Sequence, residues 1–210
     1  MKYTRFSFTE LEEISTREAK RINSITNIDL IVFVAKAGLP IALYMSKIFN
    51  CKVIPVYAER KMGIIKRLFF KCGGSFLPES VKIFLRWLEA NSGYHKRNSE
   101  RHVTFDINIT DAEKNTYKKI LVVDDSVDTG ASLSQVVAKI KQAFPMSEIY
   151  TYGLNVWSES ENVIKTDFFT LKDRLIKTPM SKDSEEHDAF LRMCRDYGLI
   201  DCGEHEECRR

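Results

Sequence analysis

Short apolar runs and amphipathic stretches alternate along the first third of the chain. Residues 30–34, LIVFV, form an apolar run rich in β-branched side chains, and a second run, KVIPVY, occupies residues 52–57. Between them, residues 41–49 repeat apolar positions at helical spacing. The simplest structure for residues 30–57 is therefore a strand, a tight turn, a helix and a parallel strand.

The same alternation returns after residue 115. The run ILVV at 120–123 predicts a strand buried on both faces, 131–144 a helix, and 148–156 and 167–171 two further strands. Strands that alternate with helices are typical of an α/β fold. We therefore expect a doubly wound, mainly parallel sheet flanked by helices.

Three segments lie outside this alternation. Residues 9–23 show the pattern of an amphipathic helix, with Thr9 and Glu12 in the spacing of a capping box. Residues 58–115 mix basic stretches with one predicted helix at 79–90, and we interpret them as a hood-like lobe inserted into the sheet.

The charged segment 181–210 contains one predicted helix at 185–197 and should be peripheral. The whole chain, residues 1–210, is expected to form a single domain.

Composition narrows the class of protein. The chain has 210 residues, of which 44% are hydrophobic and 29% charged, as in ordinary globular proteins. A formal net charge of +3 is too small to indicate nucleic-acid binding. With no apolar segment near the ~20 residues that span a bilayer, and no apolar signal core at the start, we expect a cytoplasmic protein without membrane or nucleic-acid partners.

The five cysteines are odd in number and scattered, which favours free thiols over structural disulfides. Four residues of the last segment are of types that bind zinc: Cys194, Cys202, His205 and Cys208. Their spacing fits no familiar zinc module, so free thiols are the alternative.

The central segment 120–132, ILVVDDSVDTGAS, combines several features of a ligand site. Asp124 and Asp125 follow the apolar strand, at the edge where parallel sheets bind ligands. Adjacent carboxylates there can accept hydrogen bonds from a vicinal diol and help to hold Mg²⁺. A solvated acidic turn is the alternative, but it does not account for the features that follow.

The turn after the acid pair leads into a helix N-terminus, which favours an anion such as phosphate. Gly130 allows close approach of a ligand to the backbone, and the hydroxyls of Thr129 and Ser132 can add hydrogen-bond donors. One segment therefore offers a diol site and a phosphate site.

This segment resembles the phosphoribosyl pyrophosphate (PRPP) signature of the type I phosphoribosyltransferases along its whole length. The resemblance implies that Asp124 and Asp125 contact the ribose hydroxyls and the metal. It assigns the 5′-phosphate to the turn formed by Asp128, Thr129, Gly130, Ala131 and Ser132.

The turn AKAG at 35–38 resembles the pyrophosphate-binding loop of the same family. Lys36, Ala37 and Gly38 would hold the leaving pyrophosphate, and the Lys36–Ala37 bond is the candidate for the cis peptide often found there. A generic strand-to-helix turn is the alternative for this segment alone.

Three positions concern the acceptor base. An acid at Asp128 resembles the 6-oxopurine enzymes, where it would act as general base. Lys165, in VIKTDFF, resembles the lysine that these enzymes place against the exocyclic oxygen. Leu175 stands where the family usually supplies an aromatic ring that stacks on the base, which favours an unusual acceptor.

The resemblance thus implies a Mg²⁺-dependent transfer of a phosphoribosyl group from PRPP to a nucleobase, with a 6-oxopurine as first choice and purine salvage as the context. Two alternatives stay open: a regulator that senses PRPP or a nucleotide without catalysis, and an enzyme with a specialised acceptor outside salvage. Members of the family are often dimers or tetramers.

Overall fold

The computed structural model describes residues 3–60, 101–104 and 109–199. The chain divides into two compact units, one formed by Met1–Ala58 with Val103–Arg210 and the other by Glu59–His102. Nearly all of the second unit lies outside the described residues, as does the helix predicted at 79–90. The hood-like lobe and the single domain stay predictions.

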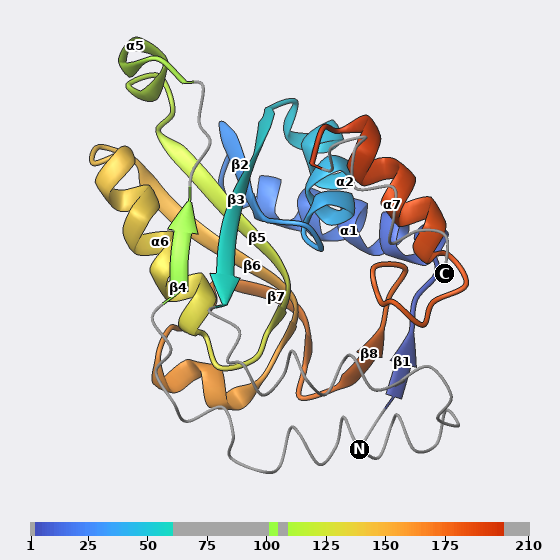
Figure 1. Cartoon of the computed structure of the whole chain (residues 1–210). Coiled ribbons are helices and arrows are strands. Elements are labelled where there is room, and N and C mark those ends of the chain that lie inside the picture. The colour runs from blue at the N-terminus through green and yellow to red at the C-terminus, as the bar shows by residue number, and fades with distance from the viewer. Residues whose placement is uncertain (1–2, 61–100, 105–108, 200–210) are drawn as a thin grey trace. The chain divides into compact units, whose positions relative to one another are not determined.

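Six strands form the main sheet in the order β4-β3-β2-β5-β6-β7 (Figure 1). Four pairings, β3 with β2, β2 with β5, β5 with β6 and β6 with β7, are parallel. The strands are β2 (Leu30–Val34), β3 (Lys52–Arg60), β4 (Arg101–Thr104), β5 (Lys119–Val127), β6 (Glu148–Val156) and β7 (Phe168–Lys172). The predicted α/β class with a mainly parallel sheet is confirmed.

Helices cover both faces of this sheet. The helices α1 (Phe8–Asn23), α2 (Leu39–Phe49) and α7 (His187–Asp196) pack into one apolar core with the side chains of Ile31, Phe33, Leu121 and Val123. Helix α6 (Ala131–Ala143) packs into a second core on the other face, with Leu30, Val32, Ile120 and Val122. Figure 1 shows α6 on the opposite side of the sheet from α1, α2 and α7.

The alternation of these core residues along β2 and β5 explains why both strands are apolar throughout: each face of the strand meets a helix layer. Residues 120–123 have no exposed surface.

Four short elements complete the described fold. Helix α5 (Asp111–Lys114) precedes β5, and the 3-10 helix η3 (Ser158–Asn162) follows β6. A separate two-stranded sheet pairs β1 (Tyr3–Arg5) with β8 (Leu175–Lys177) in parallel, so the start of the chain lies beside the strand that carries Leu175.

The first helix begins earlier than predicted, and its cap differs. Ser7 is the N-cap: its hydroxyl accepts a hydrogen bond from the N–H of Glu10, and the Glu10 carboxylate accepts from the N–H of Ser7 at 2.8 Å. The capping box is therefore Ser7 with Glu10, and the prediction of Thr9 with Glu12 was wrong. Both pairs have the same spacing, so the spacing alone could not choose between them.

The last described helix is part of the core, which corrects the expected peripheral position. Phe190 and Cys194 of α7 are buried, and the Tyr197 hydroxyl donates to the carbonyl oxygen of Val53 at 2.7 Å. The aromatic ring of Tyr197 also packs edge-on against Phe33 of β2. The many charges of this segment suggested a peripheral position, although the helix has a short apolar face.

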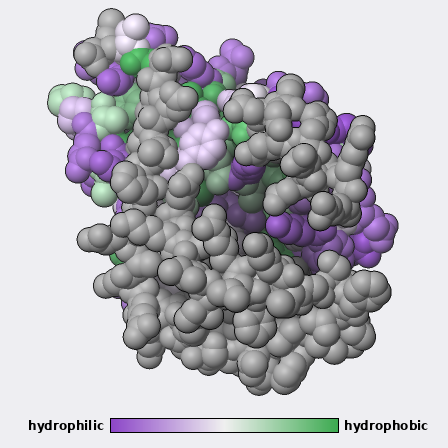
Figure 2. Space-filling view, in the orientation of Figure 1, coloured by the Kyte–Doolittle hydropathy of each residue, from purple (hydrophilic) through white to green (hydrophobic). Residues whose placement is uncertain are grey.

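The described helices include none of the length and apolar character that a membrane span needs. Where Figure 2 shows described residues, the surface is mostly hydrophilic, with smaller apolar areas between.

Replacing the N-cap should destabilise the first helix. Ser7→Ala removes the acceptor for the Glu10 N–H, and we expect the free energy of unfolding to fall by about 0.5–2 kcal/mol. Thr9→Ala, at an exposed helical position two residues later, is the matched control and should have little effect. Urea denaturation of both variants measures this, and a larger loss in Thr9→Ala would restore the capping box that the sequence first suggested.

Candidate active site

The acid pair lies within β5 and not after it. The strand extends to Val127, four residues beyond the predicted end, and Asp124 pairs with Gly153 of β6. Asp124 is 7% exposed and Asp125 is half-buried. Both carboxylates are therefore held by the sheet itself.

Three carboxylates lie along the end of this strand and in the turn after it, and their charges act on one another. Burial, followed by the charges of Asp125 and Asp128, raises the pKa of Asp124 well above its ordinary range. Burial and the charge of Asp128 raise the pKa of Asp125 from 3.8 to about 6. A site that is unfavourable for its own carboxylates favours a bound cation.

The turn after β5 leads directly into α6. Gly130 is the N-cap residue of α6 with φ 75°, and no side chain caps the helix. The first N–H groups of a helix have no partner within it, so they are available to an anion at this end. The hydroxyl of Thr129 accepts only a long hydrogen bond, 3.5 Å, from the N–H of Ala131.

The turn after β2 lies against the acid-bearing strand. An added Cβ at Gly38 would stand 2.9 Å from the carbonyl oxygen of Val34 and 3.0 Å from that of Val123. Because these atoms are backbone, a side chain at Gly38 would force the two strand ends apart. The glycine thus brings the turn next to the residue that precedes Asp124.

In this turn Lys36 is exposed and Ala37 half-buried. The cis peptide bond is Ala35–Lys36, one bond before the predicted Lys36–Ala37.

A close contact joins the start of α6 to the segment that carries Lys165. An added Cβ at Gly130 would stand 2.9 Å from Cγ2 of Ile164 and 3.0 Å from the carbonyl oxygen of Ser160. Lys165 follows Ile164 and is exposed. The structure therefore places Lys165 one residue from a contact with the predicted phosphate turn.

Leu175 is the first residue of β8 and half-buried. A side chain that the sequence did not single out ties it to the main sheet: the amide nitrogen of Asn155 donates to the carbonyl oxygen of Arg174 at 3.0 Å. Asn155 is 1% exposed and lies opposite Ser126 in the sheet. A polar residue within the apolar run of β6 was the signal that could have revealed it.

Asp173 is a second residue that the sequence did not single out. It has a positive φ of 53°, and its carboxylate accepts hydrogen bonds from the N–H and the hydroxyl of Ser158. Its own N–H donates to the carbonyl oxygen of Val156 at 3.0 Å. Asp173 and Asn155 together hold the turn before Leu175 against the end of β6.

The metal ligands predicted from sequence are two adjacent residues, Asp124 and Asp125. In the described part of the chain, no three His, Cys, Asp or Glu side chains gather into a metal-binding group. Of the zinc alternative only Cys194 is described, and it is a free thiol in the core whose burial raises its pKa to about 11. A thiol of that pKa disfavours the thiolate that zinc binds; Cys202, His205 and Cys208 lie outside the described residues.

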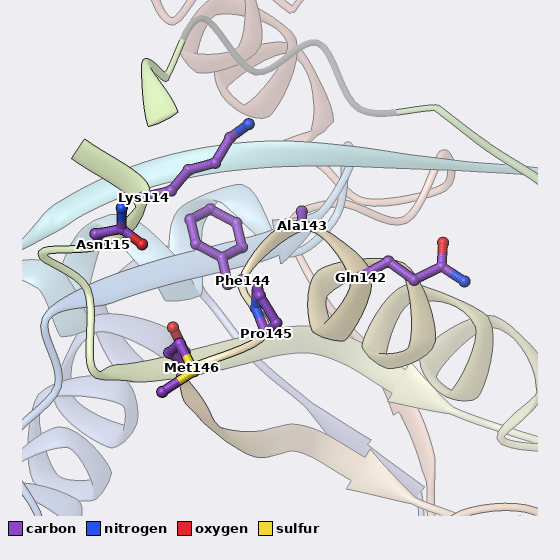
Figure 3. Close-up of a pocket in the computed structure, with 8 residues that line it drawn as sticks. Lys114, Asn115, Gln142, Ala143, Phe144, Pro145 and Met146 are labelled. Carbon is purple, nitrogen blue, oxygen red and sulfur yellow. The ribbon is translucent and has the colours of Figure 1, made fainter. Parts of the chain in front are cut away.

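The pocket in Figure 3 is separate from all of these residues. It is lined by the end of α5 and by the end of α6 with the turn before β6, at Lys114, Asn115, Gln142, Ala143, Phe144, Pro145, Met146 and Ser147. These segments precede β5 and β6, so the pocket lies at the amino ends of the strands. The predicted site lies at their carboxyl ends.

Solved structures share this fold. A purine phosphoribosyltransferase from Pyrococcus horikoshii superposes with a TM-score of 0.59 at 18% identity, covering 88% of this chain and 97% of that one. The xanthine-guanine-hypoxanthine phosphoribosyltransferase of Helicobacter pylori gives 0.59 at 18% identity, covering 90% and 98%. At this identity the likeness concerns the fold: the chain has the fold of the type I phosphoribosyltransferases, as the resemblance implied.

Sequence comparison finds distant relatives. Orotate phosphoribosyltransferases of Staphylococcus aureus are 25% identical over 103 residues, which are 47% of this chain and 46% of theirs. The match thus spans about half the length of these curated relatives. No family model matches the chain.

Asp124→Asn should stabilise the protein although it alters the predicted site. The pKa of Asp124 is raised in the folded state, and that of Asp125 is raised from 3.8 to about 6. At pH values between the ordinary and the raised pKa, the folded state therefore binds more protons than the unfolded chain. Stability therefore falls as the pH rises through this range. We expect the variant to raise the free energy of unfolding at pH 8, measured by urea denaturation across pH.

Asp173→Asn is the matched control. Hydrogen bonds from the hydroxyl and the N–H of Ser158 lower the pKa of Asp173, so its charged form stabilises the fold, and this stability is lost as the pH falls. The same substitution should therefore destabilise the protein at pH 8. Equal losses at both positions would show that Asp124 is not repelled by its neighbours.

Proposed function

We propose that the protein transfers the 5-phosphoribosyl group of PRPP to a purine base, with a 6-oxopurine as acceptor and pyrophosphate as the second product. One observation carries the proposal: the acid pair of β5, the N-terminus of α6 and the turn at 35–38 meet at one edge of the sheet. Together they offer places for a diol, a phosphate and a pyrophosphate, which are the three parts of PRPP.

The acid pair fits Mg²⁺. Two carboxylates that repel each other in a mostly buried position gain from a divalent cation, and Mg²⁺ completes its shell with water and substrate oxygens. Asp124 and Asp125 would hold the ion. When bound, it offsets the negative charge that develops on the leaving pyrophosphate.

Each segment of the edge has a role toward PRPP. Asp124 and Asp125 accept hydrogen bonds from the ribose hydroxyls. The N–H groups at the start of α6, from Gly130 through Ala131 to Ser132, donate to the 5′-phosphate with the hydroxyls of Thr129 and Ser132. Backbone N–H groups of Ala37 and Gly38 and the ammonium of Lys36 hold the pyrophosphate.

Asp128 is the proposed general base. As the bond from C1′ to pyrophosphate breaks, a bond forms from C1′ to a ring nitrogen of the acceptor, and the proton of that nitrogen passes to the Asp128 carboxylate. Such assistance contributes ~10²–10⁴ in rate. Lys165 would donate to the oxo group of the base, and Leu175 would cover one face of the ring.

The P. horikoshii and H. pylori proteins act on purines by name, and the S. aureus relatives act on orotate. The acceptor is decided by incubating the protein with Mg²⁺, PRPP and hypoxanthine, guanine, xanthine, adenine, uracil or orotate in turn, and measuring pyrophosphate. We expect release with 6-oxopurines. Release with adenine or orotate alone would overturn the choice of acceptor, and PRPP binding by calorimetry without release for any base would favour a sensing regulator.

Asp125→Asn should abolish most of the activity while the fold persists. The substitution keeps the size of the side chain but removes a charge from the proposed ribose and metal site, so we expect kcat/KM to fall roughly 100-fold. Circular dichroism checks the fold. Asp188→Asn, at an exposed carboxylate in the first turn of α7, is the control and should keep full activity; unchanged activity in Asp125→Asn would contradict the site.

A further inference from the structure

Ser126 lies between the acid pair and Asp128, and its hydroxyl is bound to the Asp128 carboxylate. Oγ of Ser126 donates to Oδ1 of Asp128 at 2.7 Å. Both side chains are half-buried. None of the proposed roles toward PRPP or the base uses this serine.

The two residues differ in how firmly their backbones are held. Ser126 belongs to β5 and pairs with Asn155 of β6, and Asn155 is buried and bonded in turn to Arg174. Asp128 lies past the end of the strand, in the turn before α6. The hydrogen bond therefore ties a carboxylate on a turn to a residue fixed in the sheet.

The hydroxyl of Ser126 is not a phosphate donor in this arrangement. A serine has one O–H to donate, and here that hydrogen goes to Asp128. Toward a ligand Ser126 can offer only oxygen lone pairs, which a phosphate repels. In this respect it differs from Thr129 and Ser132, which lie at the helix start.

We propose that Ser126 is a positioning residue for Asp128. The inference rests on the proposed function, in which the Asp128 carboxylate takes the proton of the base. The bond to Oδ1 restricts rotation of the Asp128 side chain, and Oδ2 is the oxygen that would take the proton. Side chains on strands are positioned more precisely than side chains on turns. The hydrogen bond to Ser126 of β5 therefore positions the Asp128 carboxylate more precisely than the turn alone would.

The test compares two substitutions of Ser126. Ser126→Ala removes the donor, and we expect kcat to fall roughly 10-fold because the base is misplaced. KM for PRPP should change less than about 3-fold, since the proposed role of Ser126 involves no contact with PRPP. Ser126→Thr keeps the hydroxyl on a residue that suits a strand, and it should restore most of kcat.

A double-mutant cycle with Asp128→Ala separates positioning from a general effect on the fold. If Ser126 acts through Asp128, Ser126→Ala costs nothing further once the carboxylate is gone. Steady-state kinetics of the four proteins, with the 6-oxopurine that turns over fastest, gives the coupling. Thermal unfolding of each variant accompanies it.

The outcomes are distinct. The role of Ser126 is overturned if the unaltered protein is active and Ser126→Ala leaves kcat unchanged. It is also overturned if Ser126→Ala lowers kcat equally with and without the Asp128 carboxylate. Both results leave the proposed function intact. A rise in KM for PRPP with constant kcat also overturns the role of Ser126, since that marks a binding residue. Absence of pyrophosphate release from the unaltered protein with every base overturns both proposals.

Discussion

Repulsion among three carboxylates at the end of a buried strand is the constraint on which the site depends. Asp124, Asp125 and Asp128 lie within five residues, and burial with mutual repulsion raises the pKa values of the first two. Nothing in the hydrophobic cores requires acids at this place. The four residues before them are buried between helices on both faces of the sheet. This burial of apolar side chains stabilises the strand and offsets the repulsion among the carboxylates at its end.

The parallel sheet converts this anchored strand into a ligand-binding edge. With β2 and β6 on either side of β5, the turns that follow all three strands emerge at the same side. Gly38 then allows the turn after β2 to touch the backbone beside Asp124, and Gly130 allows the start of α6 to touch the segment before Lys165. Two glycines thus set how closely segments far apart in sequence approach each other.

Local patterns predicted most of the sheet, because it follows from runs of neighbouring residues, but they placed the acid pair after β5 and not within it. The strands at 30–34 and 148–156 are confirmed to the residue. Long-range contacts were beyond such patterns. The core position of α7 depends on a few apolar residues that meet β2 and α2 in space, and the capping pair of α1 was one of two with equal spacing.

The same distinction separates the proposed PRPP site from the proposed base position. PRPP would be held by turns that directly follow central strands, so its signature is contiguous in sequence. The proposed base position instead depends on Leu175 of a separate sheet, paired with the start of the chain and held through Asn155 and Asp173. The position of Leu175 thus depends on single polar residues in segments that carry no recognisable motif. Substitution of such residues can change the acceptor specificity of such an enzyme without any change in its PRPP signature.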